Sequence, residues 1–285
     1  MIARNILDWS AGGQHRATSL TEDDFYRFRK WLVDAALADK TVHDRGIVFK
    51  QMLRWAVSRK LLAQNPFADI RLSKPEPTPQ PVLTAQQVGI LLQQANAHMR
   101  PIIATLAWTG MRIGELAELR WADLQTNDHG QAFFVISEGG STPGKTKGRH
   151  SRDLPINPQL MDVLGVLPRD GERIFTAMPT TMYPQTGRPV NERRVLASFK
   201  QLCRKCGFEN WRKLKLHTLR HTFASIAVQE GLSERYVLEF MGHRSSAILD
   251  HYVHTYDAAA HAAICAIKYP MSAPNRTKEK TCSGE

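Results

Sequence analysis

Apolar residues recur at helical spacing in the first part of the chain. The segment SLTEDDFYRFRKWLVDAAL begins with Thr21 as a helix cap and an acidic first turn. Its apolar stripe is predicted to comprise Phe25, Phe28, Trp31, Leu32 and Ala35. A second helix is predicted over TVHDRGIVFKQMLRWAVSRKLL, capped by Thr41 and stopped by Pro66, with an apolar face of Val48, Met52, Trp55 and Ala56. The N-terminal part of the chain is therefore predicted to be helical.

Alternating prolines interrupt this pattern in KPEPTPQPVL. Proline fixes its own φ and lacks a backbone N–H, so the stretch can neither continue a helix nor lie in a central strand. It predicts an extended, semi-rigid linker. We therefore expect a small helical domain at residues 1–74, a linker at 75–82, a larger domain at 83–268 and a disordered polar tail at 269–285.

The larger domain combines helical periodicity with a short β pattern. Helices are predicted over TAQQVGILLQQAN, over PIIATLAWTG up to Gly110, and over MRIGELAELRWADL. Two strands, QAFFVIS and RDLPI, flank the Gly- and Lys-rich loop EGGSTPGKTKGRHS. Three more helices are predicted over VNERRVLASFKQLCRKCGF, HTLRHTFASIAVQEG and SERYVLEFMGH. The expected fold class is mainly α with a small antiparallel β-sheet (α+β), in two domains.

The charge of the chain points to a polyanionic partner. Its 285 residues carry 38 Lys/Arg against 27 Asp/Glu, a net charge of +11. Such an excess favours nucleic acid over a membrane surface, because no basic amphipathic anchor stands out, and scattered surface lysines are the alternative. No apolar run reaches the length of a membrane span, and the N-terminus lacks the apolar core of a signal peptide. We expect a cytoplasmic protein that associates with the nucleoid.

The N-terminal domain carries candidate DNA contacts on the outer face of its second helix. Residues 1–74 hold 13 Lys/Arg and 8 Asp/Glu. A charged helix face can be merely solvated, but charges mostly of one sign also suit phosphate contacts. The candidates on this face are Arg45, Lys50 and Arg54. Cysteine chemistry is not expected, because Cys203 and Cys206 form a lone CxxC without a second pair.

Two helical segments carry residues that suit an anion. In HTLRHTFASIA, His217, Arg220 and His221 fall at i, i+3 and i+4 and so share one helix face. The planar fork of an arginine can grip an anionic oxygen, and an imidazole near a helix start can add a hydrogen bond. A histidine pair at this spacing could also hold a metal, but no third ligand is evident. In TGMRIGELAELRW, Arg112 and Glu115 form either a helix-start ion pair or part of the same anion site.

Two further segments leave alternatives open. Lysines and arginine in the loop between the strands either approach a phosphodiester or are solvated; they are Lys145, Lys147 and Arg149. In MGHRSSAILDHYVH, which holds three histidines, Tyr252 is either an aromatic that fills a gap or a nucleophile with a histidine placed to serve it.

Together these motifs resemble one family. TGMRIGELAELRW, KGRHSRDLPI, HTLRHTFAS, MGH and DHYVH follow the order and spacing of the tyrosine recombinases, the phage-integrase and Xer-like family, over roughly residues 20–260. The resemblance implies an N-terminal helical core-binding domain and a mixed catalytic domain that clamp double-stranded DNA at a specific site. It also implies a tetramer on DNA, in which the segment TYDAAAHAAICAIKY is either exchanged between protomers or packed on its own domain. Accessory DNA-bending or directionality factors are expected partners.

The resemblance also assigns roles. Arg112 and Arg220 would clamp the scissile phosphate, and His217 and His243 would hydrogen-bond it. Tyr252 would attack the phosphorus to form a 3′-phosphotyrosine. Further roles fall to Lys147, the general acid with Lys145 as competitor, and to the supporting residues Glu115 and His221. No metal or other cofactor is implied.

The resulting hypothesis is an enzyme that breaks and rejoins DNA, a site-specific recombinase acting as integrase or resolvase of a mobile element. A catalytically idle DNA-binding relative and a type IB topoisomerase are the rivals. Because only about twenty residues precede SLTEDDFYRF, the first helix of the DNA clamp is expected to be short or absent.

Overall fold

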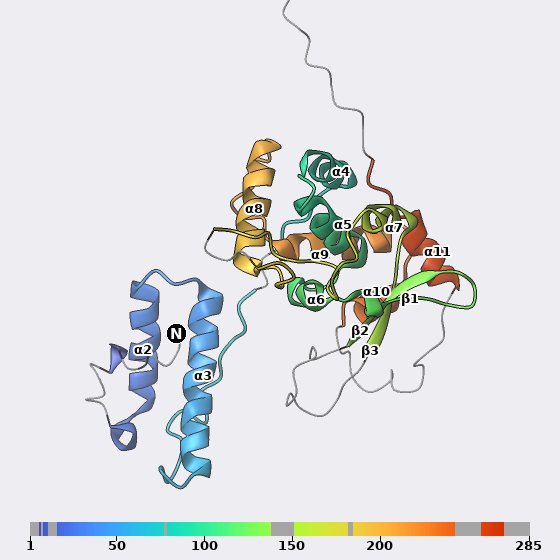
Figure 1. Ribbon diagram of the computed structural model, residues 1–285. Coiled ribbons are helices and arrows are strands. Elements are labelled where there is room, and N and C mark those ends of the chain that lie inside the picture. Colours follow the sequence, from blue (N-terminus) through green and yellow to red (C-terminus); the bar gives the residue numbers. More distant parts are fainter. Residues whose placement is uncertain are drawn as a thin grey trace, which may run out of the picture. The chain divides into compact units, whose positions relative to one another are not determined.

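The computed structural model describes residues 6, 8–10, 16–76, 79–137, 151–181, 185–242 and 258–270. The chain divides into two compact units, Met1–Pro79 and Gln80–Glu285 (Figure 1). Within the described ranges, no helix is long and apolar enough to cross a membrane.

Two helices of unit 1 (Met1–Pro79) pack around aromatic side chains. They are α2 (Glu22–Asp34) and α3 (Asp39–Ser58), which follow the short 3-10 helix η1 (Ala17–Ser19), and residues 6, 8 and 9 are also helical. As predicted, Thr21 caps α2, and its backbone N–H donates to Asp24 Oδ2 at 2.9 Å. Between α2 and α3 the rings of Phe28 and Phe49 pack edge to face with centroids 5.0 Å apart. Such aromatic pairs bury large apolar areas and hold the two helices together.

The predicted face of α3 was wrong. Its N-cap is Ala38 rather than Thr41, and the buried side of the helix comprises Val42, Arg45, Gly46, Phe49 and Leu53. The predicted apolar residues Met52 and Trp55 are instead 39% and 55% exposed. The helix carries two apolar stripes. The stripe that contains Phe49 packs in the aromatic core, whereas the sequence predicted the other stripe to be buried.

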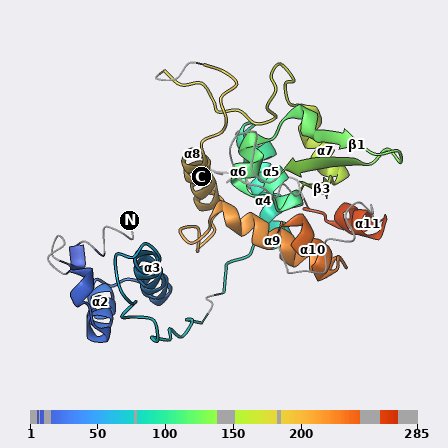
Figure 2. The same cartoon turned by 90° about the horizontal axis from the view of Figure 1, so that it is seen from below.

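Unit 2 (Gln80–Glu285) is built around one buried helix. Its helices are α4 (Ala85–Gln94), α5 (Met99–Thr109), α6 (Ile113–Glu118), α7 (Pro158–Gly165), α8 (Glu192–Lys205), α9 (Leu216–Gln229), α10 (Glu234–Phe240) and α11 (Ala258–Ala266), with a 3-10 turn η2 (Trp121–Asp123). Every residue of α5 except Arg100 is buried, and α5 packs against α4, α7 and α9. Figure 2 shows α10 beside α9. α7 lies in a stretch for which the sequence predicted no helix.

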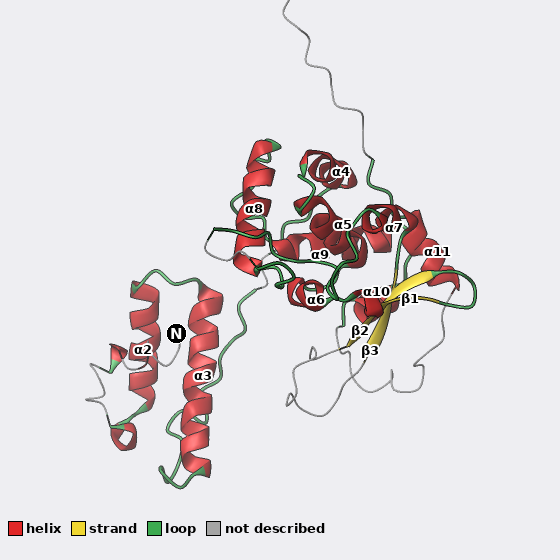
Figure 3. Ribbon diagram, viewed as in Figure 1, coloured by secondary structure: helices red, strands yellow, loops and turns green. Residues whose placement is uncertain are grey.

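A three-stranded antiparallel sheet lies at one side of unit 2 (Figure 3). Its strands are β1 (Leu124–Thr126), β2 (Ala132–Ser137) and β3 (Ser151–Pro155). β2 and β3 are the predicted strands and pair from Phe133↔Pro155 to Ser137↔Ser151. β1 was not predicted, and the helix expected over MRIGELAELRWADL ends at Glu118. Backbone bonds to a distant segment replace helical ones here, with Ile174 N donating to Leu119 O at 3.0 Å.

The C-terminal boundary of unit 2 also needs correction. Tyr269, assigned to a disordered tail, is 1% exposed, and its hydroxyl donates to Ala107 O at 2.7 Å. Gly89 has no room for a side chain, because a Cβ there would lie 2.0 Å from Pro270 O. The chain therefore packs on unit 2 up to residue 270.

α11 packs on its own unit. The side-chain amide of Asn157 donates to Ile264 O at 2.8 Å and to Ile267 O at 2.9 Å. Of the two alternatives for this segment, the single chain adopts the packed one.

Candidate active site

The turn from α5 to α6 positions Arg112. Gly110 ends α5 in the left-handed conformation at φ 62°, where a Cβ would lie 2.3 Å from the ring of Phe223. Arg112 then caps α6 in an extended conformation. Its backbone N–H donates to Glu115 Oε2 at 2.8 Å, and its Nη1 lies 3.1 Å from Glu115 Oε1. The glycine turn and the helix start thus orient one arginine against one glutamate, and Arg112 keeps a side chain that is 40% exposed.

Arg220 is buried in the middle of α9. It is 1% exposed, and its Nη1 donates to Gly110 O at 2.7 Å. The apolar face predicted for this helix is buried as expected, with Leu219, Phe223, Ile226 and Ala227 in the core. Burial and the positive charges of Arg112 and Arg152, opposed by Glu115, together lower the pKa of Arg220 to about 10. The guanidinium is therefore a cation at neutral pH.

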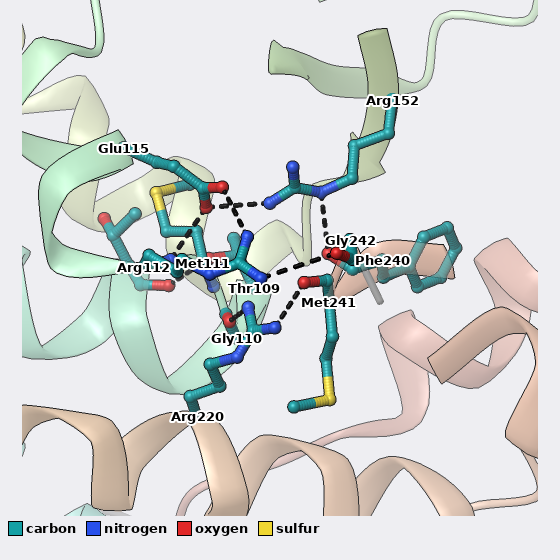
Figure 4. A network of polar contacts seen from close by, with 11 residues as sticks. Thr109, Gly110, Met111, Arg112, Glu115, Arg152, Arg220, Phe240, Met241 and Gly242 are labelled. Carbon is teal, nitrogen blue, oxygen red and sulfur yellow. Dashed lines mark hydrogen bonds and ion pairs between the residues drawn. The ribbon is translucent and has the colours of Figure 1, made fainter. Parts of the chain in front are cut away.

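Three guanidinium groups bind the backbone carbonyls of the last residue of α10 and of the two residues that follow it. Phe240 O, Met241 O and Gly242 O each accept one hydrogen bond (Figure 4). The donors, in the same order, are Arg152 Nε at 2.9 Å, Arg220 Nη2, and Arg112 Nη2 at 3.4 Å. Carbonyls at the end of a helix have no partner within the helix and carry partial negative charge. The arrangement therefore fixes the backbone immediately before position 243.

Arg152 is the member of this group that the sequence did not predict. Its Nη2 donates to Glu115 Oε2 at 2.7 Å, so one carboxylate joins Arg112 and Arg152. Burial raises the pKa of Glu115, but the hydrogen bonds and charges of Arg152 and Arg112 outweigh it and hold this pKa below its ordinary value. In this network, three guanidinium groups face one carboxylate. The surplus of positive charge suits a bound anion such as a phosphodiester.

The two histidines of α9 lie beside Arg220 in sequence but differ in exposure from it. His217 is exposed, His221 is half-buried, and their rings meet edge to face with centroids 5.3 Å apart. Burial, with the nearby charge of Arg220, lowers the pKa of His221. His221 is therefore neutral at neutral pH. The structure brings together Arg112, Glu115 and Arg220 in one network and places these histidines on the first turns of the same helix.

The remaining predicted catalytic residues lie outside the described residues. They are Lys145, Lys147 and Arg149 of the loop between β2 and β3, and His243 and Tyr252 after α10. Both segments start from positions that the structure does describe. Ser137 pairs with Ser151 across the base of the loop, and Gly242 belongs to the arginine network.

Of the DNA-binding candidates in unit 1, only one is exposed. Arg45 is 8% exposed and faces the core of unit 1, so its prediction as a surface contact was wrong. The Lys50 ammonium donates to the backbone carbonyls of Ala68, at 3.3 Å, and Ile70. Arg54 is exposed.

In the part of the chain that the structure describes, no three His, Cys, Asp or Glu side chains lie close enough together to hold a metal ion. Cys203 is buried, and burial raises the pKa of its thiol to about 12. The CxxC motif is therefore a packing element at neutral pH.

Comparison with known proteins agrees with this arrangement. The family model described as "Phage integrase family" matches residues 81–259. The tyrosine recombinase XerC of Xanthomonas campestris pv. campestris (strain B100) is 25% identical over 269 residues, covering 89% of this chain and 79% of the relative.

Two solved structures share the fold. The integrase of transposon Tn1549, in complex with circular intermediate DNA, has a TM-score of 0.63 at 22% identity and covers 91% of this chain and 90% of its own. A lambda integrase tetramer bound to a Holliday junction has a TM-score of 0.56 at 18% identity, covering 84% of this chain and 67% of its own. Because the family model spans more than half of the chain, this protein belongs to the phage integrase family, the tyrosine recombinases, which cleave and rejoin DNA.

Proposed function

We propose that this chain is an active site-specific recombinase, the integrase or resolvase of a mobile element, that cuts double-stranded DNA through a 3′-phosphotyrosine. The observation that carries the proposal is the meeting of Arg112 and Arg220 at the end of α10. They come from positions 108 residues apart in the sequence, and the site holds more positive charge than Glu115 compensates. A surplus of this kind stabilises the charge that builds up on a phosphorane-like transition state.

The roles of the site residues follow from this geometry and from the family motifs. Arg112 and Arg220 hold the non-bridging oxygens of the scissile phosphate, and His217 and His243 add hydrogen bonds. The Tyr252 phenolate forms the new P–O bond as the bond to the 5′ oxygen breaks. Lys147 gives that oxygen its proton, with Lys145 as the competing donor. Glu115 and His221 support the two arginines, and no metal or other cofactor takes part.

The DNA surface of unit 2 extends along α8 and the segment that leads into α9. Residues 192–215 hold eight Lys/Arg against two Asp/Glu, more than half of the net charge of the chain. Arg212, Lys213 and Lys215 are exposed, and the Arg212 guanidinium lies 4.5 Å from the centre of the Trp211 ring. Such a run suits phosphate contacts along a duplex. Arg54, Lys50 and the loop residues Lys145 and Arg149 are the further DNA-binding candidates, whereas Arg45 is buried.

The partners we propose are a duplex with a specific recombination site and further copies of this chain. The lambda integrase tetramer on a Holliday junction supports a tetramer on DNA. Accessory DNA-bending or directionality factors would set the direction of the reaction. The substrate places the protein in the cytoplasm, at the nucleoid.

Covalent capture tests the proposal. A library of nicked duplexes with a randomised centre is incubated with the protein, and adducts that survive denaturant are recovered and sequenced. We expect adducts with the native chain, with a common sequence at the cleaved position. Tyr252→Phe should abolish them, whereas the matched control Tyr256→Phe, four residues later, should leave them intact.

Other outcomes identify the rivals. Adducts formed by Tyr252→Phe would show that another residue is the nucleophile. DNA binding without any adduct would indicate the idle relative, and relaxation of supercoiled plasmid without sequence preference would indicate a type IB topoisomerase.

A further inference from the structure

Arg152 is a charged side chain buried in a strand. It lies in β3, and its side chain is 7% exposed. Its Nη2 donates to Glu115 Oε2 at 2.7 Å and its Nε donates to Phe240 O at 2.9 Å. A buried cation is tolerated only when it is paired and hydrogen-bonded, and a planar guanidinium can satisfy two differently placed acceptors at once. The geometry therefore makes Arg152 a link between α6, β3 and α10.

Both acceptors are themselves connected to Arg112. Glu115 receives the backbone N–H and the Nη1 of Arg112, and Arg112 Nη2 reaches Gly242 O. The other terminal nitrogen of Arg152, Nη1, lies against Gly242, where a Cβ would be 3.0 Å away. This Nη1 is buried and has no hydrogen-bond partner among the described residues. Arg152 thus braces, from one side, the carboxylate that orients Arg112 and the last turn before position 243.

We infer that Arg152 is a positioning residue for DNA cleavage, which acts by holding Glu115, and through it Arg112, together with the backbone at the end of α10. This inference rests on the function proposed above. Arg152 touches neither DNA nor the reacting atoms in this role, so it affects the rate of cleavage and not the binding of the duplex.

The expected effects separate positioning from binding. Arg152→Ala leaves Glu115 without its shortest partner and Phe240 O without its donor. A displacement of about 1 Å at catalytic groups lowers the rate about 100-fold, and we expect a loss of this size in single-turnover adduct formation. The duplex concentration that half-saturates the protein should stay unchanged. Arg152→Lys keeps the charge but cannot span both acceptors. Its rate of adduct formation should therefore lie between the rates of the native chain and of Arg152→Ala.

The matched control is Arg173→Ala. Arg173 Nη1 lies 2.9 Å from Glu118 Oε2, so it also pairs a glutamate of α6, but this pair is exposed and Glu118 takes no part in the arginine network at the end of α10. Loss of an arginine and of a glutamate pair on α6 is therefore common to both variants. Only Arg152→Ala should slow adduct formation, and millimolar methylguanidinium should restore part of its rate, which a role in folding alone would not allow.

Hydrogen–deuterium exchange gives a readout that does not need the reaction. Amides at the end of α10, in the peptide 237–242, should exchange faster in Arg152→Ala than in the native chain or in Arg173→Ala. Unchanged exchange there, or an equal rate loss in Arg173→Ala, would overturn the positioning role. If the native chain forms no adduct with the duplex library, the proposed function fails, and the exchange experiment still decides whether Arg152 holds the end of α10.

Discussion

Gly242 is the residue at which backbone conformation and charge meet. It has φ 62°, in the left-handed region, and an added Cβ would lie 3.0 Å from Arg152 Nη1 and 3.4 Å from Arg112 Nη1. Two separate requirements therefore demand glycine here. The left-handed turn ends α10, and the missing side chain lets two guanidinium groups approach the backbone.

Substitution of Gly242 by alanine separates these two requirements. The left-handed conformation costs an alanine about 1–2 kcal/mol, so the free energy of unfolding should fall by that amount. In addition, the methyl group should displace the guanidinium of Arg152 or Arg112, and adduct formation should slow by about 100-fold. Chemical denaturation and single-turnover capture on the selected duplex measure the two effects.

Gly231→Ala is the control. Gly231 also has a positive φ, 90°, but a Cβ there would meet nothing within 4 Å. The Gly231→Ala variant should lose about as much stability as Gly242→Ala but keep the cleavage rate of the native chain. Equal rates in the two alanine variants would show that the guanidinium groups tolerate a side chain at position 242.

At the scale of elements, the start of α6 combines a helix cap with an ion-pair centre. Glu115 lies in the first turn of α6, where the helix dipole favours a negative charge, and it binds Arg112 and Arg152. Because these partners lower its pKa below the ordinary value of 4.5, the folded state favours the carboxylate more than the unfolded state does. The stabilisation is thus fully present above the unfolded pKa and is lost as pH falls through the lower, folded pKa.

Glu115→Gln should remove this pH dependence. The native chain should lose stability as pH falls below about 4.5, whereas the variant should be less stable at pH 7 and flatter across the acid range. Urea titrations at several pH values measure the difference. Glu118→Gln, which removes the surface partner of Arg173 on the same helix, should retain the native slope. If Glu115→Gln loses stability with falling pH as the native chain does, another group is responsible for the pH dependence.

Elements determined by local sequence were predictable, and those determined by distant partners were not. Thr21 at the start of α2 and Gly110 at the end of α5 are local signals, and both predictions were confirmed. The early end of α6 is accompanied by a backbone bond from Ile174 N to Leu119 O, and β1 depends on its pairing with β2, and no local pattern reveals either partner.

The predictions of which face of a helix is buried and of which charged side chains are buried failed for the same reason. Arg45 was assigned to the surface because α3 has two apolar stripes, and only the aromatic core of unit 1 decides between them. The burial of Arg152 was not predicted, because an arginine in an alternating strand is expected to face solvent. A polar position on the strand next to the Lys-rich loop was the one available signal.

At the scale of the whole molecule, the two units have separate hydrophobic cores. One cluster contains only residues from Ile6 to Ile70 and the other only residues from Leu83 to Tyr269. Each of these clusters, as far as the described residues show, is formed within one unit, so each unit has the means to fold alone. The fragment 80–285 should therefore unfold cooperatively and keep the arginine network, which thermal denaturation followed by circular dichroism can check.

Salt dependence of DNA binding should reveal what unit 1 contributes. Each phosphate contact to duplex DNA adds about 0.9 to the slope of log K against log salt concentration, because it releases counterions. If unit 1 binds the backbone of the duplex, the fragment 80–285 should show a shallower slope than the full chain. Arg54→Ala in the full chain should lower the slope by about 0.9, since Arg54 is exposed, whereas Arg45→Met should leave it unchanged because Arg45 is buried. Equal slopes for fragment and full chain would mean that the contacts to phosphate lie in unit 2, where residues 192–215 concentrate the positive charge.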